Sequence, residues 1–178
     1  GRDCLAENTK QFKYGSFKDA RDGETYRTVK IGNQVWMAEN LRFKAENSYA
    51  PDNDEANVEK FGRLYTWTSA LDIPPEFSEQ TPAKDIEMYR KMKEPNYQGI
   101  APEGWHIPSN KEWEELLSNV AGKPDGSEFR SKSDWQNPGK DTFGFLALPA
   151  GYRFDNGSFC HFGRRARFWS KDAYVKSN

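Results

Sequence analysis

The pattern of apolar and polar positions predicts a β-hairpin near the start of the chain. Residues 24–31 and 34–38 are rich in β-forming side chains, and Gly32 and Asn33 separate them. A Gly-Asn pair between two such runs is typical of a tight turn, because glycine adopts a positive φ without steric cost.

A second hairpin is predicted near the end of the chain. Residues 152–154 and 158–162 flank Asn156 and Gly157, another pair that favours a tight turn. Residues 168–170 predict one more short strand, because two aromatic side chains stand together there.

Helical signals lie between the hairpins. Ser109 and Glu112 form a capping-box pattern at the start of a helix. Apolar residues then follow at helical spacing and predict one buried stripe: Trp113, Leu116, Leu117 and Val120. A second helix is predicted within residues 82–94. Strands at both ends around central helices predict an α+β fold with two main helices and small twisted antiparallel sheets.

The length of 178 residues suits a single domain. We expect residues 1–16 to be a leader segment and residues 17–178 to form the domain. The mean hydropathy is −0.99 and the net charge is −1, which excludes a strongly basic nucleic-acid-binding protein. No apolar stretch is long enough for a membrane span. Aromatic residues make up 15% of the chain and are expected to supply most of the core.

The sequence does not predict a catalytic centre. A nucleophile needs a positioned base and an orienting group, and neither His106 nor His161 lies in such a pattern. Asp52, Asp54 and Asn57 offer closely spaced oxygen atoms of the kind that calcium prefers. The alternative is an ordinary solvated acidic loop, which we favour, and we expect no cofactor.

The last part of the chain combines basic and aromatic residues. Residues 150–178 carry six lysines and arginines against two acidic residues, whereas residues 1–149 are net negative. Two interpretations remain open: the rings form core and the arginines a solvated face, or the segment binds an acidic glycan or a protein partner. The candidate ligand-binding residues are Tyr152, Arg153, Phe154, Phe159, His161, Arg164, Arg165 and Arg167.

The two cysteines, Cys4 and Cys160, lie near opposite ends of the chain. A disulfide between them would close a long loop and add on the order of 4–5 kcal/mol to the stability. The alternative is two free thiols in a reducing compartment.

Several sequence blocks resemble the Fibrobacter succinogenes major paralogous domain family. They are residues 28–41, 62–67, 102–109 with Glu112 and Trp113, 141–145, 148–153 and 168–170, which contain Gly-Asn-Gln-Val-Trp-Met-Ala-Glu-Asn-Leu, Gly-Arg-Leu-Tyr-Thr-Trp and Pro-Glu-Gly-Trp-His-Ile-Pro-Ser, among others. The resemblance implies a C-type-lectin-like fold, similar to that of formylglycine-generating enzymes, and a secreted or surface protein of Bacteroidota or Fibrobacterota, such as a lipoprotein. It supplies no catalytic residues.

This sequence departs from the family pattern in two respects. Positions where members often carry cysteines hold Ala50, Val58 and Ala101. Members usually continue beyond the Phe-Trp-Ser block into further strands, so we expect the last strands of the family to be absent from residues 17–178 or to come from another chain.

These observations together predict a non-catalytic binding or adhesion module outside the cell or on its surface, with a glycan as the favoured ligand. The alternative is a structural or assembly subunit that docks on a surface protein complex, because an unpaired sheet edge can accept a strand from a partner.

Overall fold

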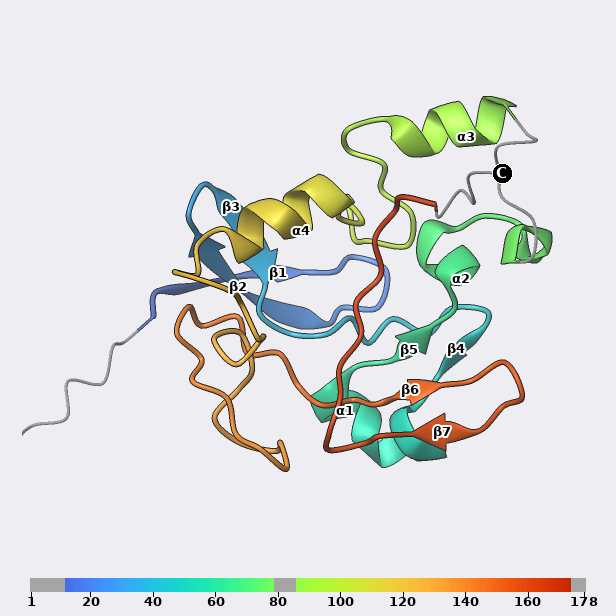
Figure 1. Ribbon diagram of the computed structural model, residues 1–178. Coiled ribbons are helices and arrows are strands. Elements are labelled where there is room, and N and C mark those ends of the chain that lie inside the picture. Colours follow the sequence, from blue (N-terminus) through green and yellow to red (C-terminus); the bar gives the residue numbers. More distant parts are fainter. Residues whose placement is uncertain (1–11, 79–85, 174–178) are drawn as a thin grey trace, which may run out of the picture.

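The computed structural model describes residues 12–78 and 86–173 (Figure 1). The described residues form three small antiparallel sheets: β1 (Tyr14–Lys18), β2 (Thr25–Ile31) and β3 (Gln34–Met37); β4 (Ser48–Tyr49) with β5 (Leu64–Tyr65); and β6 (Tyr152–Arg153) with β7 (Phe159–Cys160). The helices are α1 (Val58–Phe61), α2 (Trp67–Leu71), α3 (Ile86–Lys93) and α4 (Asn110–Leu117), with 3₁₀ turns η1 (Pro51–Asn53), η2 (Glu55–Asn57) and η3 (Pro75–Ser78). Small sheets and short helices agree with the predicted α+β class.

Both predicted hairpins form. In the first, β2 pairs with β3 so that Ile31 stands opposite Gln34, and Gly32 has a φ of 58°. In the second, β6 pairs with β7 around Gly157, which has a φ of 89°. The turn residues named from the sequence therefore lie at the tips of the hairpins.

Helix α4 has the predicted N-terminal cap but is shorter than expected. The Ser109 side chain accepts a hydrogen bond from the backbone N–H of Glu112, and the Glu112 carboxylate accepts one from the backbone N–H of Ser109. Leu116 is buried, but Leu117 is 38% exposed, which corrects the predicted stripe. Val120 still packs on the core although it lies beyond the end of the helix.

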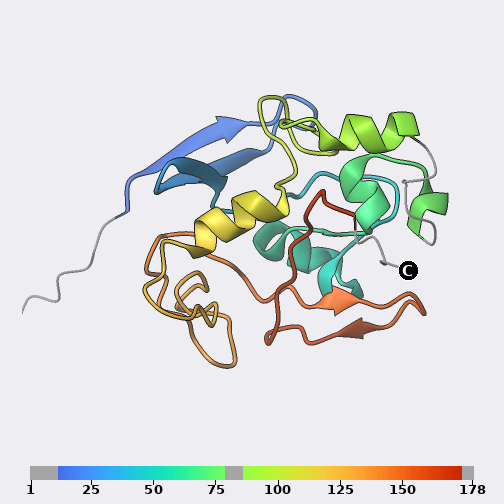
Figure 2. The same ribbon diagram turned by 45° about the horizontal axis from the view of Figure 1, so that its top comes forward.

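The interior consists of two apolar clusters. The larger one joins β2, β3 and α4 to the segment 129–147 and includes Val29, Leu116 and Phe145. The smaller one joins α2 and α3 through Leu71 and Met92. Figures 1 and 2 show that the C-terminal segment, drawn in red, runs between α4 on one side and α2 and β5 on the other.

Two further expectations differ from the structure. Residues 168–170 form no strand; the carbonyls of Trp169 and Ser170 accept hydrogen bonds from indole side chains, as described below. β1 begins at Tyr14, inside the segment expected to be a leader, because every residue of β1 pairs with a residue of β2, from Tyr14 with Val29 to Lys18 with Thr25. No helix in the described residues is long and apolar enough to cross a bilayer.

Candidate functional site

The described residues form a cleft of about 2110 Å³, and the C-terminal segment, residues 166–173, helps to line it. Its wall is formed by β3 and the residues after it, β5, the start of α4, β6 and the C-terminal segment. Aromatic side chains supply much of this wall: Trp36, Tyr49, Tyr65, Trp67, Phe77, Trp105, Trp113, Phe145, Tyr152, Phe154, Phe168 and Trp169.

Tryptophan indoles hold the C-terminal segment, residues 166–173, in place along the cleft. The Trp67 Nε1–H donates to the Ser170 carbonyl at 2.9 Å, and the Trp113 Nε1–H donates to the Trp169 carbonyl at 3.1 Å. The Trp169 Nε1–H in turn donates to the Tyr65 carbonyl at 2.8 Å. These bonds satisfy backbone carbonyls that a neighbouring strand would otherwise bind, which explains why residues 168–170 are not a strand.

The end of the same segment is fixed by charged groups. Lys171 is only 5% exposed, and its ammonium group donates to the carbonyls of Glu94 and Pro95. Asp172 accepts from the backbone N–H of Asn110 at 2.6 Å, at the N-terminus of α4. The segment therefore has a defined position against the N-terminus of α4 and the residues that follow α3.

Three aromatic side chains of the cleft remain open to solvent. Phe154 is 45% exposed, Phe168 is 44% exposed and Trp169 is 49% exposed, whereas every other aromatic side chain in the described ranges is at least partly buried. Because all three line the cleft, the exposed rings of the described chain gather at one place. Exposed aromatic residues that gather in a concave site are typical of a binding surface.

Two arginines of the cleft rest on aromatic rings. The Arg167 Cζ lies 3.7 Å from the centre of the Tyr152 ring, and the Arg153 Cζ lies 4.1 Å from the centre of the Tyr49 ring. Cation–π contact at this distance is favourable and restricts the position of the guanidinium group.

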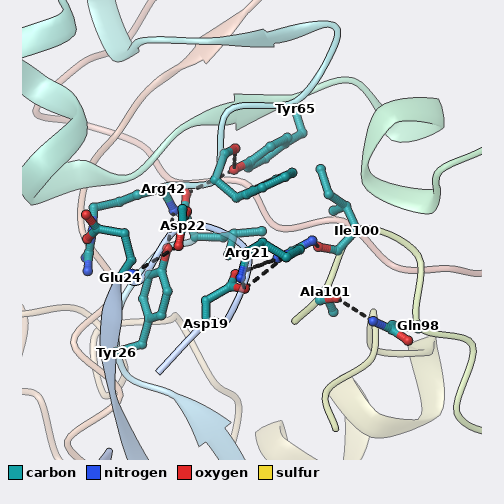
Figure 3. A network of polar contacts seen from close by, with 12 residues as sticks. Asp19, Arg21, Asp22, Glu24, Tyr26, Arg42, Tyr65, Gln98, Ile100 and Ala101 are labelled. Carbon is teal, nitrogen blue, oxygen red and sulfur yellow. Dashed lines mark hydrogen bonds and ion pairs between the residues drawn. The ribbon is translucent and has the colours of Figure 1, made fainter. Parts of the chain in front are cut away.

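A polar network around Arg21 reaches Ile100, a residue of the cleft wall (Figure 3). Arg21 donates from Nη2 and Nε to Asp19 at 2.6 and 2.9 Å, and from Nη1 to the carbonyl of Ile100, which lines the cleft. The hydrogen bonds from Arg21 hold the pKa of the Asp19 carboxyl below its ordinary value. Nearby, Tyr65 donates its hydroxyl to the carbonyl of Phe43 at 2.6 Å, and burial raises its pKa.

His106 is part of the cap of α4. Its Nε2 lies 2.7 Å from Glu112 Oε1, while Glu112 Oε2 accepts from the backbone N–H and the hydroxyl of Ser109 at 2.8 and 2.9 Å. Burial raises the pKa of Glu112, but the hydrogen bonds from Ser109 and His106 outweigh this effect and bring it below its ordinary value. The carboxylate thus serves the helix terminus, with His106 as an additional partner.

The structure divides the residues that the sequence analysis named as ligand-binding. Tyr152, Arg153, Phe154 and Arg167 line the cleft. Phe159, His161, Arg164 and Arg165 lie on the same stretch of chain but outside the cleft wall. Trp36, Trp105 and Trp169 belong to the wall although sequence reasoning assigned them no ligand role.

Two of the three residues proposed for calcium, Asp54 and Asn57, form local hydrogen bonds. Asp54 Oδ1 accepts from the backbone N–H of Ala56 at 3.0 Å, and Asn57 donates its amide to the carbonyl of Pro51 at 3.0 Å. Asp52 is exposed. Within residues 12–78 and 86–173, no three acidic, histidine or cysteine side chains gather in a group that could hold a metal ion. The calcium site at Asp52, Asp54 and Asn57 stays a prediction.

Cys160 is half-buried on β7. Its proposed partner, Cys4, lies outside the described residues, so the disulfide stays a prediction.

Comparison with known proteins identifies the family. The sequence profile of the Fibrobacter succinogenes major domain matches residues 29–178. Because this match covers most of the chain, the protein belongs to that family, which confirms the resemblance seen in the sequence. No curated protein and no solved structure matches the chain.

Proposed function

We propose that this protein is a non-catalytic binding module that holds a glycan in the aromatic cleft. The observation that carries the proposal is the gathering of the exposed rings Phe154, Phe168 and Trp169 in that cleft. The C–H face of a sugar ring packs well on an aromatic face, while its hydroxyl groups need polar partners beside the ring. Arg153 and Arg167 supply such partners.

Preorganisation supports the same proposal. Trp169 is about half exposed, yet its indole N–H and its carbonyl are both hydrogen bonded to the protein. A ring that is already fixed loses little conformational freedom when a ligand binds, which favours affinity. The absence of a catalytic role is part of the proposal, and it rests on His106 and Glu112 being engaged in the cap of α4.

A glycan array followed by titration calorimetry tests the proposal. Trp169→Ala and Phe154→Ala should each weaken binding of an array hit by about tenfold, because each removes one stacking surface. Leu117→Ala is the matched control, since Leu117 is an exposed apolar residue outside the cleft wall. The proposal fails if no glycan binds, or if the cleft variants bind as tightly as the control.

The finer assignments of fold and location are also proposals. We propose a C-type-lectin-like fold and a position outside the cell or on its surface, and both rest on the sequence blocks given above. An experimental structure compared with lectin-like domains tests the first. Surface biotinylation of intact source cells tests the second, with a cytoplasmic protein as the control.

The outer edge of β3 favours a second candidate function, assembly with another protein. Gln34 and Trp36 stand opposite Ile31 and Val29 of β2 and form the backbone hydrogen bonds to that strand. Val35 and Met37 alternate with them, so their backbone N–H and C=O groups point away from β2. Within the described residues these groups have no hydrogen-bond partner. An unpaired edge of this kind can accept an extended strand.

The native mass of the protein extracted from its source cells tests this candidate. Assembly through β3 predicts a mass above that of the single chain, and Val35→Pro should reduce it to that of the single chain, because proline removes an edge donor. Lys18→Pro, on the edge strand β1 at the opposite side of the sheet, is the control. A single-chain mass for the unmodified protein counts against assembly.

A further inference from the structure

Among the described arginines, those paired with a carboxylate differ from the two that contact aromatic rings in the cleft. Arg21, Arg42 and Arg63 each form an ion pair with a carboxylate. Arg153 and Arg167 have no ion pair and no side-chain hydrogen bond among the described residues, and their only recorded contacts are with aromatic rings. Both line the cleft, so their N–H donors are available to a ligand there.

Ring contact leaves the donors of a guanidinium group free. The Tyr152 ring supports Arg167 with a Cζ-to-centre distance of 3.7 Å, and the Tyr49 ring supports Arg153 at 4.1 Å. An aromatic face binds the guanidinium through its charge and its plane, and it does not use the N–H groups at the rim. A planar group with several N–H donors matches the two oxygen atoms of a carboxylate.

The acidic residues of the cleft wall do not neutralise these two arginines. Glu39 pairs with Arg27 and Arg42, which lie outside the cleft wall. Glu112 is bound to the cap of α4, and Asp172 is bound to Lys93 and to the backbone N–H of Asn110.

Asp155 is the remaining acidic residue of the wall, and it is exposed and without a recorded partner. One free carboxylate stands against two free guanidinium groups, so the uncommitted charge of the wall is positive.

Two exposed aromatic rings, Phe154 and Trp169, line the same cleft as both arginines. Phe154 lies next to Arg153 in the sequence, and its ring centre is 5.1 Å from that of Tyr152, which supports Arg167. Trp169 follows Arg167 by two residues, and its ring is oriented by the hydrogen bond to the Tyr65 carbonyl. Both arginines and both exposed rings therefore line one cleft, and Phe154 lies beside the ring that supports Arg167.

We propose that the ligand of the cleft is an acidic polysaccharide that contains uronic acid residues. Arg167 and Arg153 bind the carboxylates, and Phe154 and Trp169 receive the faces of the sugar rings. This inference rests on the proposed glycan-binding function and specifies its ligand class.

Binding of purified protein to a panel of polysaccharides tests the inference. The panel contains polygalacturonate, alginate and hyaluronate as uronic-acid polymers, methyl-esterified polygalacturonate and dextran as uncharged polymers, and poly-L-glutamate as a carboxylate polymer without sugar rings. We expect at least one uronic-acid polymer to bind. Its affinity should be about tenfold or more above that of the uncharged polymers, and binding should weaken as the salt concentration rises.

Variants identify the residues responsible. Arg167→Gln and Arg153→Gln should each weaken binding of the uronic-acid polymer by about tenfold, and Arg167→Lys should recover only part of the loss because lysine lacks the planar donor group. Arg164→Gln is the matched control: it removes the same charge from an exposed residue of the same segment that lies outside the cleft wall. Circular dichroism confirms that each variant is folded.

The outcomes separate this inference from the proposed function. Binding of neutral glycans with no preference for uronic acids overturns the inference and leaves the glycan-binding function standing. Equal binding of poly-L-glutamate overturns it in favour of an acidic peptide. Equal losses in Arg167→Gln and Arg164→Gln overturn it in favour of diffuse charge attraction. Failure of every glycan to bind overturns both.

Discussion

Asp19→Ala is expected to lower the free energy of unfolding by about 2–3 kcal/mol. The Asp19 carboxylate is 1% exposed and accepts from Arg21 Nη2 at 2.6 Å, from Arg21 Nε at 2.9 Å and from the Arg21 backbone N–H at 3.0 Å. A hydrogen bond to a charged group contributes roughly 1.5–3 kcal/mol, and breaking a fully buried ion pair costs roughly 3–5 kcal/mol. The Arg21 side chain is 31% exposed, so in Asp19→Ala water replaces part of the hydrogen bonding that Arg21 loses. The expected cost is therefore nearer to that of a hydrogen bond to a charged group than to that of breaking a fully buried ion pair.

Urea unfolding followed by tryptophan fluorescence measures this cost, and the melting temperature should fall by about 4–12 °C. Asp22→Ala is the matched control, because Asp22 is an exposed acid in the same turn whose recorded bond is to the backbone N–H of Glu24. It should cost about 0.5 kcal/mol. Adding Arg21→Ala to Asp19→Ala should cost less than the sum of the two single changes, since both remove the same interaction.

The effect of Asp19→Ala should also depend on pH. Hydrogen bonding to Arg21 lowers the pKa of Asp19 in the folded protein below its unfolded value. The stability that the carboxylate contributes is therefore present above the unfolded pKa and is lost as the pH falls through the folded pKa. The difference between the unmodified protein and Asp19→Ala should shrink on acidification. Equal stability losses in Asp19→Ala and Asp22→Ala at neutral pH, or a difference that grows in acid, would refute the reasoning.

Two further changes test how the cleft wall is built. Gly62→Ala should lower the free energy of unfolding by at least about 2 kcal/mol, because Gly62 has a φ of 72° and a Cβ there would lie 2.3 Å from the Asn40 Cβ. The control is Gly126→Ala, at a φ of 82° with nothing within 4 Å of the added Cβ, and it should cost about 1 kcal/mol. Equal costs in thermal unfolding would contradict the steric explanation. Glu112→Ala should lower the free energy of unfolding by about 1–2 kcal/mol, because it removes the capping box of α4. Glu115→Ala, at an exposed position of the same helix, should change it by no more than about 0.5 kcal/mol. A comparable loss at both positions in urea unfolding would argue against the cap.

The fold could be predicted from the sequence wherever neighbouring residues decide the structure. Gly32 and Gly157 mark turns because their backbone conformations are costly for other residues, and both hairpins form there. The Ser109–Glu112 cap also joins residues three positions apart. The strand predicted at residues 168–170 was wrong, because the carbonyls of Trp169 and Ser170 accept from indoles far away in the sequence.

The candidate site could be predicted only in part. The sequence pointed to Tyr152, Arg153, Phe154 and Arg167 through the basic and aromatic character of their segment, and these residues line the cleft. It gave no reason to separate them from Arg164, which has the same character and lies outside the wall. Composition reports which side chains are present in a segment, but strand direction and packing decide which of them face a common space.

What the sequence by itself determined is the set of local elements, the α+β class and the family, because each depends on residues that are close together in the chain or on ordered blocks of sequence. Only the tertiary structure decided that Trp169 is exposed in the same cleft as Arg167, while the indole N–H groups of Trp113 and Trp67 donate to carbonyls of the C-terminal segment. A tryptophan side chain can thus support the fold or stay open to solvent, depending on which distant backbone groups lie near it. The packing of the whole domain decides which groups those are.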